Sequence, residues 1–221
     1  YNAAQNSLIT MSQPRSPVSE AYRSLRTNLQ FAGVNAPMRT IMVTSASPAD
    51  GKTSVAANLA AVIAQNQKQV VIVDSDLRRP RVHKVFELSN RIGLSDYFIR
   101  TQDRLSGVVK KSKIDGLGVV TSGSLPPNPS ELLNSEKMIE VIKLLENHFQ
   151  MLILDTPPLL AVTDALVLAP RVDGVILVVD PKVTKRGALR HAIEQLQRVN
   201  ANLLGVVINN IEIKRSQYYY N

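Results

Sequence analysis

The chain of 221 residues contains no cysteine. That absence excludes a disulfide framework, a zinc site built on thiolates and a cysteine nucleophile. Aromatic residues are scarce: with four Phe, six Tyr and no Trp, few rings are available to stack on bases. We therefore expect no nucleic-acid partner.

No run approaches the ~18 consecutive apolar residues of a membrane-spanning helix. The three histidines, His83, His148 and His191, are isolated in sequence and suggest no metal site.

Basic residues are in excess, with a formal net charge of +8. A basic surface favours an anionic partner such as a nucleotide, a nucleic acid or membrane headgroups. The alternative is a surface that is merely well solvated, because the basic residues are scattered and no block is longer than "LRRPR". Charge alone leaves both readings open.

Strand-like and helix-like segments alternate along the chain. The predicted strands are 39–45, 69–74, 116–123, 151–158, 174–180 and 203–209. The predicted helices are 16–32, 51–65, 129–149 (one helix or two), 162–170 and 185–199. The strands are apolar throughout, which is typical of strands covered on both faces in a parallel sheet. The sequence therefore predicts a doubly wound, mostly parallel α/β sheet flanked by helices, with ligands at the carboxyl ends of the strands.

The stretch "TSASPADGKTS" (44–54) lies between a predicted strand and a predicted helix, as a phosphate-binding loop requires. Gly51 lets the backbone approach phosphates, Lys52 reaches the β- and γ-phosphate oxygens, and Thr53 ligates magnesium. The first glycine of the common pattern is replaced by Ala46, so a chance Gly-Lys-Thr is the alternative. The predicted nucleotide-binding residues of this loop are Ser47, Ala49, Asp50, Gly51, Lys52, Thr53 and Ser54.

Acidic residues end two of the buried strands. Asp155 closes "MLILD" and is interpreted as a Walker B carboxylate that holds magnesium, although it could also cap the following turn. Asp74 and Asp76 are two residues apart, which puts both on one side of an extended chain. They suit the ordering of the metal's waters and acceptance of a proton from an attacking hydroxyl. Arg78 could reach a phosphate oxygen or pair with an aspartate. The predicted cofactors are ATP and Mg²⁺, with the metal held by Thr53, Asp76 and Asp155.

Five motifs occur in order: "SPVSEAYRSLRTNLQF", "TSASPADGKTS", "VIVDSDLRRP", "TSGSLPPNPSELL" and "LILDTPPLLAVTDA". Over about residues 15–210 they resemble the bacterial tyrosine kinases of capsule and exopolysaccharide synthesis, the BY-kinases, which are relatives of the MinD/ParA P-loop ATPases. The resemblance implies that Asp74, Asp76 and Asp155 are the catalytic and metal-ordering acids. It also implies a ring of subunits in which one chain's tyrosine tail enters a neighbour's site. The second lysine that MinD/ParA proteins carry near the start of the loop is absent from positions 45–50.

Glu20, Arg23 and Arg26 fit the E-x-x-R-x-x-R pattern of this family. Their spacing forms a slanting stripe on a helix. Within the helix Glu20 and Arg23 could simply pair, at about 0.2–0.5 kcal/mol. The functional reading is that the stripe docks on the adjacent subunit and fixes the geometry of the ring.

The chain ends in "KRSQYYYN", and Tyr218, Tyr219 and Tyr220 are interpreted as phosphoacceptors in a polar tail. An incidental aromatic end is the alternative.

Asn209, after the last strand, is expected to hydrogen-bond adenine, although Asn210 follows it where related ATPases often have Arg. Ser130 is expected to be a helix N-cap. Asp164 is expected to serve the metal or acceptor site, or to cap a helix.

The domain organisation predicted is a linker over 1–17, cut from a longer chain with an upstream membrane segment, a kinase domain over 18–213 and a tyrosine-rich tail over 214–221. We expect a tyrosine kinase that autophosphorylates its tail at the cytoplasmic face of the bacterial membrane, with Lys52 and Arg78 neutralising the γ-phosphate and Asp76 as the base. The expected partners are further copies of the chain, a membrane polysaccharide co-polymerase segment and a cognate tyrosine phosphatase. Two rivals remain: a MinD/ParA-type switch ATPase, and a scaffold whose nucleotide site only shapes the oligomer.

Overall fold

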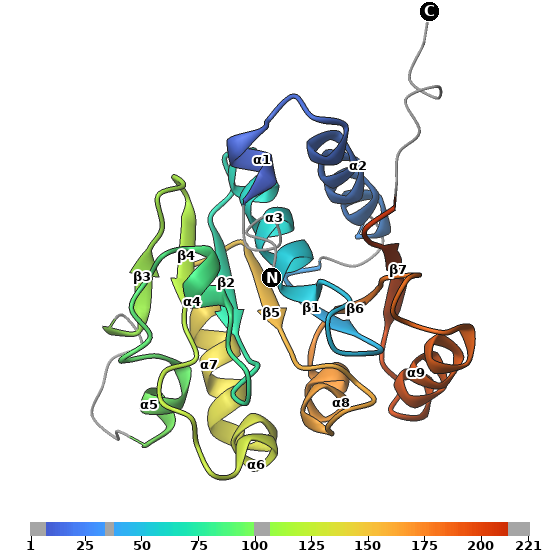
Figure 1. Cartoon of the computed structure of the whole chain (residues 1–221). Helices are drawn as coiled ribbons and strands as arrows, with labels where there is room; N and C mark the ends of the chain where they lie inside the picture. Colours follow the sequence, from blue (N-terminus) through green and yellow to red (C-terminus); the bar gives the residue numbers. More distant parts are fainter. Residues whose placement is uncertain (1–7, 34–37, 100–106, 212–221) are drawn as a thin grey trace, which may run out of the picture.

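The computed structural model describes residues 8–33, 38–99 and 107–211 (Figure 1). Its centre is a seven-stranded sheet in the order β3-β4-β2-β5-β1-β6-β7, and each neighbouring pair is parallel except β3 with β4. The strands are β1 (Thr40–Ser45), β2 (Val70–Asp74), β3 (Val109–Lys111), β4 (Leu117–Val120), β5 (Met151–Asp155), β6 (Gly174–Val179) and β7 (Leu203–Ile208). The predicted doubly wound, mostly parallel α/β fold is confirmed.

Helices cover both faces of the sheet (Figure 1). One face packs against α2, α3 and α4, and the other against α5 to α9, so that each face has its own apolar core. The helices are α1 (Ile9–Ser12), α2 (Pro17–Ala32), α3 (Lys52–Ala64), α4 (Val82–Val85), α5 (Leu94–Ile99), α6 (Pro129–Asn134), α7 (Glu136–Glu146), α8 (Asp164–Leu168) and α9 (Arg186–Arg198). A 3-10 turn, Ala169–Arg171, follows α8.

Strands β1, β2, β5 and β6 are buried along their whole length, as their largely apolar sequences predict. Each fully buried aliphatic side chain contributes about 1.5–3 kcal/mol to stability. Because these strands are parallel, their carboxyl ends meet at one edge. Asp74 of β2 and Asp155 of β5 are register partners there, and the loop after β1 begins beside them.

The prediction that every strand is covered on both faces is wrong for β7. Val206 and Ile208 are 38% and 53% exposed. The strand lies at the edge of the sheet with β6 on one side, and its burial is partial along its length. The opposite edge, β3, was not predicted at all, because a three-residue strand with two lysines has no apolar run to indicate it.

Three short helices, α1, α4 and α5, were also missed, because four to six residues carry too little periodicity. The predicted helix over 129–149 is two helices, which meet at Ser135, whose hydroxyl accepts a hydrogen bond from the backbone N–H of Met138. Within the stretch predicted as a linker, Thr10 of α1 is buried and bonds Asn58 of α3, so at least residues 9–12 belong to the packed unit. In the described part of the chain, no helix is long and apolar enough to cross a bilayer.

Candidate active site

The loop between β1 and α3 has the backbone shape of a phosphate cradle. Ala49 and Gly51 have φ angles of 70° and 89°. A Cβ atom at position 51 would lie 2.0 Å from the Nδ2 atom of Asn209, so any other residue would have to displace that side chain. Within the described chain no side chain caps the start of α3, and the helix dipole favours an anion there.

Lys52, the first residue of α3, reaches back across the site. Its Nζ atom lies 3.0 Å from Asp76 Oδ2, 3.5 Å from Asp155 Oδ1 and 3.4 Å from Thr53 Oγ1. Burial by itself lowers the pKa of Lys52, but the charges of Asp155 and Asp76 outweigh that effect and the pKa is raised. The ammonium group therefore stays charged, as a ligand for phosphate oxygens requires.

One oxygen of Asp155 makes an ion pair with Lys52 but, within the described chain, no hydrogen bond. Its Oδ2 atom accepts a 2.7 Å hydrogen bond from Thr53 Oγ1, whereas the buried Oδ1 atom has no hydrogen-bond partner among the described residues. Burial raises the pKa of Asp155, against the lowering effects of Lys52 and Thr53. An orphaned buried carboxylate oxygen beside a threonine hydroxyl fits a Mg²⁺ ion, which takes oxygen ligands.

The two aspartates after β2 have different surroundings. Asp74 is fully buried, and its Oδ2 atom accepts hydrogen bonds from the N–H groups of Arg81 (3.1 Å) and Val82 (3.0 Å). Burial and then the charge of Asp155 raise its pKa well above the ordinary value. Asp76 instead turns one oxygen toward Lys52 and accepts the N–H of Arg79 with the other, at 2.9 Å. Asp76 therefore faces the loop lysine, and Asp74 braces the loop that carries it.

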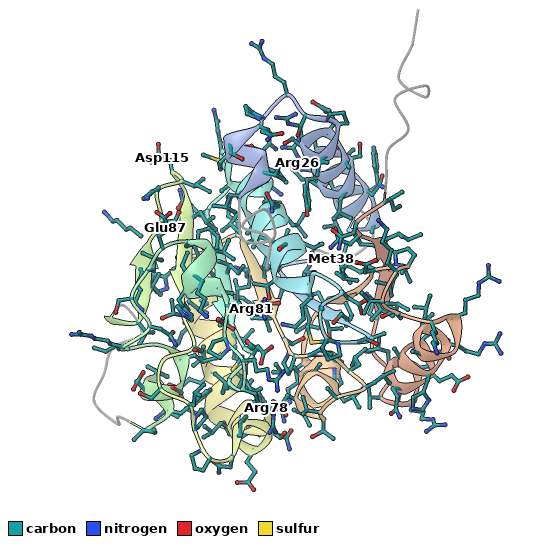
Figure 2. All side chains as sticks on the ribbon, in the orientation of Figure 1. Arg26, Met38, Arg78, Arg81, Glu87 and Asp115 are labelled. Carbon is teal, nitrogen blue, oxygen red and sulfur yellow. The ribbon has the colours of Figure 1, made fainter. Side chains whose placement is uncertain are left out.

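Arg78 pairs with Asp164, the second of the two options that the sequence left open. Its Nε and Nη2 atoms lie 2.9 and 3.0 Å from the two carboxylate oxygens. Figure 2 shows Arg78 where α6 and α8 approach one another. The prediction that Ser130 caps α6 is wrong: Asn128 stands at the cap, and the Ser130 hydroxyl donates to Asp164 instead.

Asp50 was predicted to contact the nucleotide, but its carboxylate holds the protein's own loops together. The side chain is fully buried and accepts hydrogen bonds from Ser47 N (2.8 Å), Asp180 N (3.0 Å) and Thr184 Oγ1 (2.7 Å). Sequence reasoning missed Asp180 and Thr184, since nothing local links them to a loop some 130 residues earlier.

Asn209, predicted to bond adenine, lies beside this loop, and its Nδ2 atom donates to the carbonyl oxygen of Asp50 at 3.0 Å. Its neighbour Asn210 donates to Asp180 Oδ2 at 2.7 Å. The end of β7, the loop after β6 and the phosphate loop are thus joined by hydrogen bonds.

The predicted docking stripe on α2 is not uniform. Arg23 pairs with Glu20 and donates to the carbonyl oxygen of Pro14 at 2.7 Å. Arg26 instead points inward and donates to the carbonyl oxygen of Val62, at the end of α3 (2.9 Å; Figure 2). The predicted acceptors Tyr218, Tyr219 and Tyr220 lie outside the described residues.

Comparisons with known proteins agree with this geometry. A family model of ParA type, described as NUBPL iron-transfer P-loop NTPase, matches residues 37–218. MinD from Pyrococcus horikoshii, solved with Mg-ADP, shares the fold, with a TM-score of 0.65 over 77% of this chain and 69% of that one, at 22% identity. The chain is therefore a P-loop NTPase, a class that binds a nucleotide with Mg²⁺.

Among P-loop NTPases, relatives that match most of this chain in sequence are named tyrosine-protein kinases. Tyrosine-protein kinase YwqD of Bacillus subtilis is 42% identical over 98% of this chain and 91% of its own length. Tyrosine-protein kinase etk of Escherichia coli is 37% identical over 96% of this chain but 29% of its own length. The solved kinase domain of Etk superposes with a TM-score of 0.89 at 36% identity, covering 97% of this chain and 85% of that one. The chain belongs to the family of bacterial tyrosine-protein kinases, which confirms the predicted family.

Proposed function

We propose that this chain is an ATP-dependent protein-tyrosine kinase that autophosphorylates its C-terminal tyrosines and so regulates capsular or exopolysaccharide synthesis. The observation that carries the proposal is the convergence of Lys52, Asp76 and Asp155 beside an uncapped helix start, in a chain whose relatives are named tyrosine-protein kinases. Relatives named for the cps region and as CapB supply the link to capsule.

Of the two tyrosines in the described residues, Tyr97 is buried and Tyr22 is partly buried, which favours the tail as acceptor. Tyr97 is 7% exposed, and burial raises the pKa of its phenol. Burial raises the pKa of Tyr22 to about 12. A phenol that is desolvated and hard to ionise is a poor nucleophile. Besides Tyr1, this leaves Tyr218, Tyr219 and Tyr220.

The transfer step follows from the side chains. Bound Mg·ATP supplies the phosphoryl group, and the metal offsets charge on the phosphates. Thr53 and Asp155 would hold the metal, and Lys52 would bind phosphate oxygens. Asp76, whose Oδ2 atom exchanges its contact with Lys52 for the tyrosine hydroxyl, accepts the phenolic proton. At the same time the tyrosine oxygen bonds to phosphorus, and the bond from phosphorus to the ADP oxygen breaks. Arg78 adds positive charge at the same edge.

Assembly and location belong to the same proposal. Copies of the chain form a ring through Glu20 and Arg23, with transfer in trans, beside a co-polymerase segment at the cytoplasmic face of the membrane. The long relative etk, of which this chain spans 29%, favours a fused membrane segment in some members, and the short relative YwqD a separate one. The kinase domain, extended to include α1, the tail over 214–221 and the cognate phosphatase complete the proposal.

One experiment separates the three candidate functions. The protein is incubated with Mg·ATP, and ADP and phosphotyrosine are both measured. We expect phosphotyrosine on residues 218–220 in the wild type and in Tyr22→Phe, and none in Lys52→Met or in the triple Tyr→Phe variant of the tail. ADP without phosphotyrosine would identify a switch ATPase, and the absence of both products would identify a scaffold.

A further inference from the structure

We propose that Asp164 and Ser130 are positioning residues of the kinase reaction. Together they hold the Arg78 guanidinium and, through it, the β2–α4 loop (residues 75–81) that carries Asp76. This inference rests on the proposed kinase function.

The contacts form a closed network across three elements. Arg78 binds both oxygens of Asp164, and its Nη2 atom also lies 3.3 Å from Ser130 Oγ. Ser130, in α6, donates to Asp164 Oδ1 and lies 3.2 Å from the hydroxyl of Thr163. A bidentate pair fixes the plane of the guanidinium as well as its position.

Burial shows which partner depends on the other. The Asp164 side chain is 0% exposed, whereas that of Arg78 is 40% exposed. A buried carboxylate requires hydrogen-bond donors or a cation, and Arg78 is the basic side chain that pairs with Asp164 in the described part of the chain. The outer part of the guanidinium remains open to an incoming group. Asp164 therefore holds Arg78 without using all of its donors.

The loop passes this constraint on to Asp76. One oxygen of Asp76 accepts the N–H of Arg79, and the other faces Lys52 at 3.0 Å. Arg78 lies between the two ends of that turn. If Arg78 is released from Asp164, the middle of the turn can move. Asp76 is then no longer held in the orientation that accepts the tyrosine proton. Displacements of about 1 Å in such geometry cost roughly 100-fold in rate.

The first test uses the nucleotide-free protein. We expect the Nε–H signal of Arg78 in NMR spectra to exchange slowly with solvent in the wild type and in Glu87→Gln. Glu87→Gln is a control that removes a carboxylate from an exposed ion pair with Lys113. In Asp164→Asn the protection should be lost, since an amide nitrogen then faces the guanidinium. Rapid exchange in the wild type would overturn the proposal.

The second test is a double-mutant cycle on tail phosphorylation. Asp164→Asn should lower kcat by about 10–100-fold while the KM for ATP changes less than about threefold, because the phosphate loop is untouched. In an Arg78→Ala background the same substitution should have no further effect. An unchanged kcat, or losses that multiply independently, would overturn the proposal.

Ser130→Ala covers the case in which Asp164→Asn does not fold. It should lower kcat in the same direction by a smaller factor, again only when Arg78 is present, and Glu87→Gln should leave kcat unchanged. A wild-type protein without phosphotyrosine would contradict the proposed function itself, and is thereby distinguished from failure of this inference.

Discussion

At the scale of single residues, two buried aspartates at neighbouring strand ends have separate tasks. Asp155 keeps one oxygen without a hydrogen bond, toward Lys52, whereas both oxygens of Asp74 accept backbone N–H groups. Burial favours the protonated form of each. Asp155 thus keeps an oxygen that a metal ion could use, whereas Asp74 commits both oxygens to the backbone of the β2–α4 loop and of Val82.

The raised pKa of Asp74 leads to a prediction about pH. Because the folded-state value lies above the unfolded one, the stabilisation due to this group is present at low pH and is lost as pH rises from about 4 through the folded-state pKa. Asp74→Asn should remove a slope of up to about 1.4 kcal/mol per pH unit from the free energy of unfolding.

Urea denaturation between pH 4.5 and 8 measures that slope for both proteins. Asp115→Asn, at an exposed carboxylate, should leave it unchanged. A difference between wild type and Asp74→Asn that does not vary with pH would contradict the assignment.

At the scale of elements, the phosphate loop depends on one glycine. The positive φ at Gly51 is strained for any other residue, and a Cβ atom there would push Asn209 off its hydrogen bond to Asp50. Gly51→Ala should therefore lower the free energy of unfolding by about 1–2 kcal/mol and weaken nucleotide binding.

Gly187, in the first turn of α9, is the matched control. A Cβ atom there meets nothing within 4 Å. Gly187→Ala should be neutral or stabilise by about 0.5–1 kcal/mol in the same denaturation experiment. Equal effects of the two substitutions would show that the loop conformation is not constrained.

At the scale of the whole molecule, elements from most of the chain meet at the carboxyl edge of the sheet. The phosphate loop follows β1, Asp76 follows β2, Asp155 ends β5, and Asp180 follows β6. A ligand at that edge therefore stabilises the fold as a unit.

Magnesium and nucleotide should accordingly raise the melting temperature. At about 100 times its Kd, Mg·ADP should stabilise the protein by about 2.7 kcal/mol. EDTA should reverse much of that gain, because Asp155 then faces the phosphates with only the Lys52 ammonium, and no metal ion, to offset their charge. Thermal melts with and without EDTA test this, and an equal shift in Lys52→Met would contradict the assigned site.

The strand-end carboxylates and the phosphate loop were predictable from sequence because their signals are local. A buried parallel strand that ends in Asp155 puts that residue at the ligand-binding edge, whatever its neighbours are. The same reasoning placed Asp76 and Lys52 at this edge. It failed for β7 and β3, because the position of a strand within the sheet decides its exposure and sequence does not give that position.

The sequence by itself determined the class of fold, the cradle around Gly51 and Lys52, and the set of acids around it, since each depends on a few adjacent residues and the period of the backbone. Only the tertiary structure decided which charges pair. Arg78 meets Asp164 86 positions later, and Thr184 bonds Asp50 134 positions earlier. Such pairs form because helices and loops packed on a sheet bring distant residues into contact, and a buried carboxylate is stable only beside the donors that packing supplies.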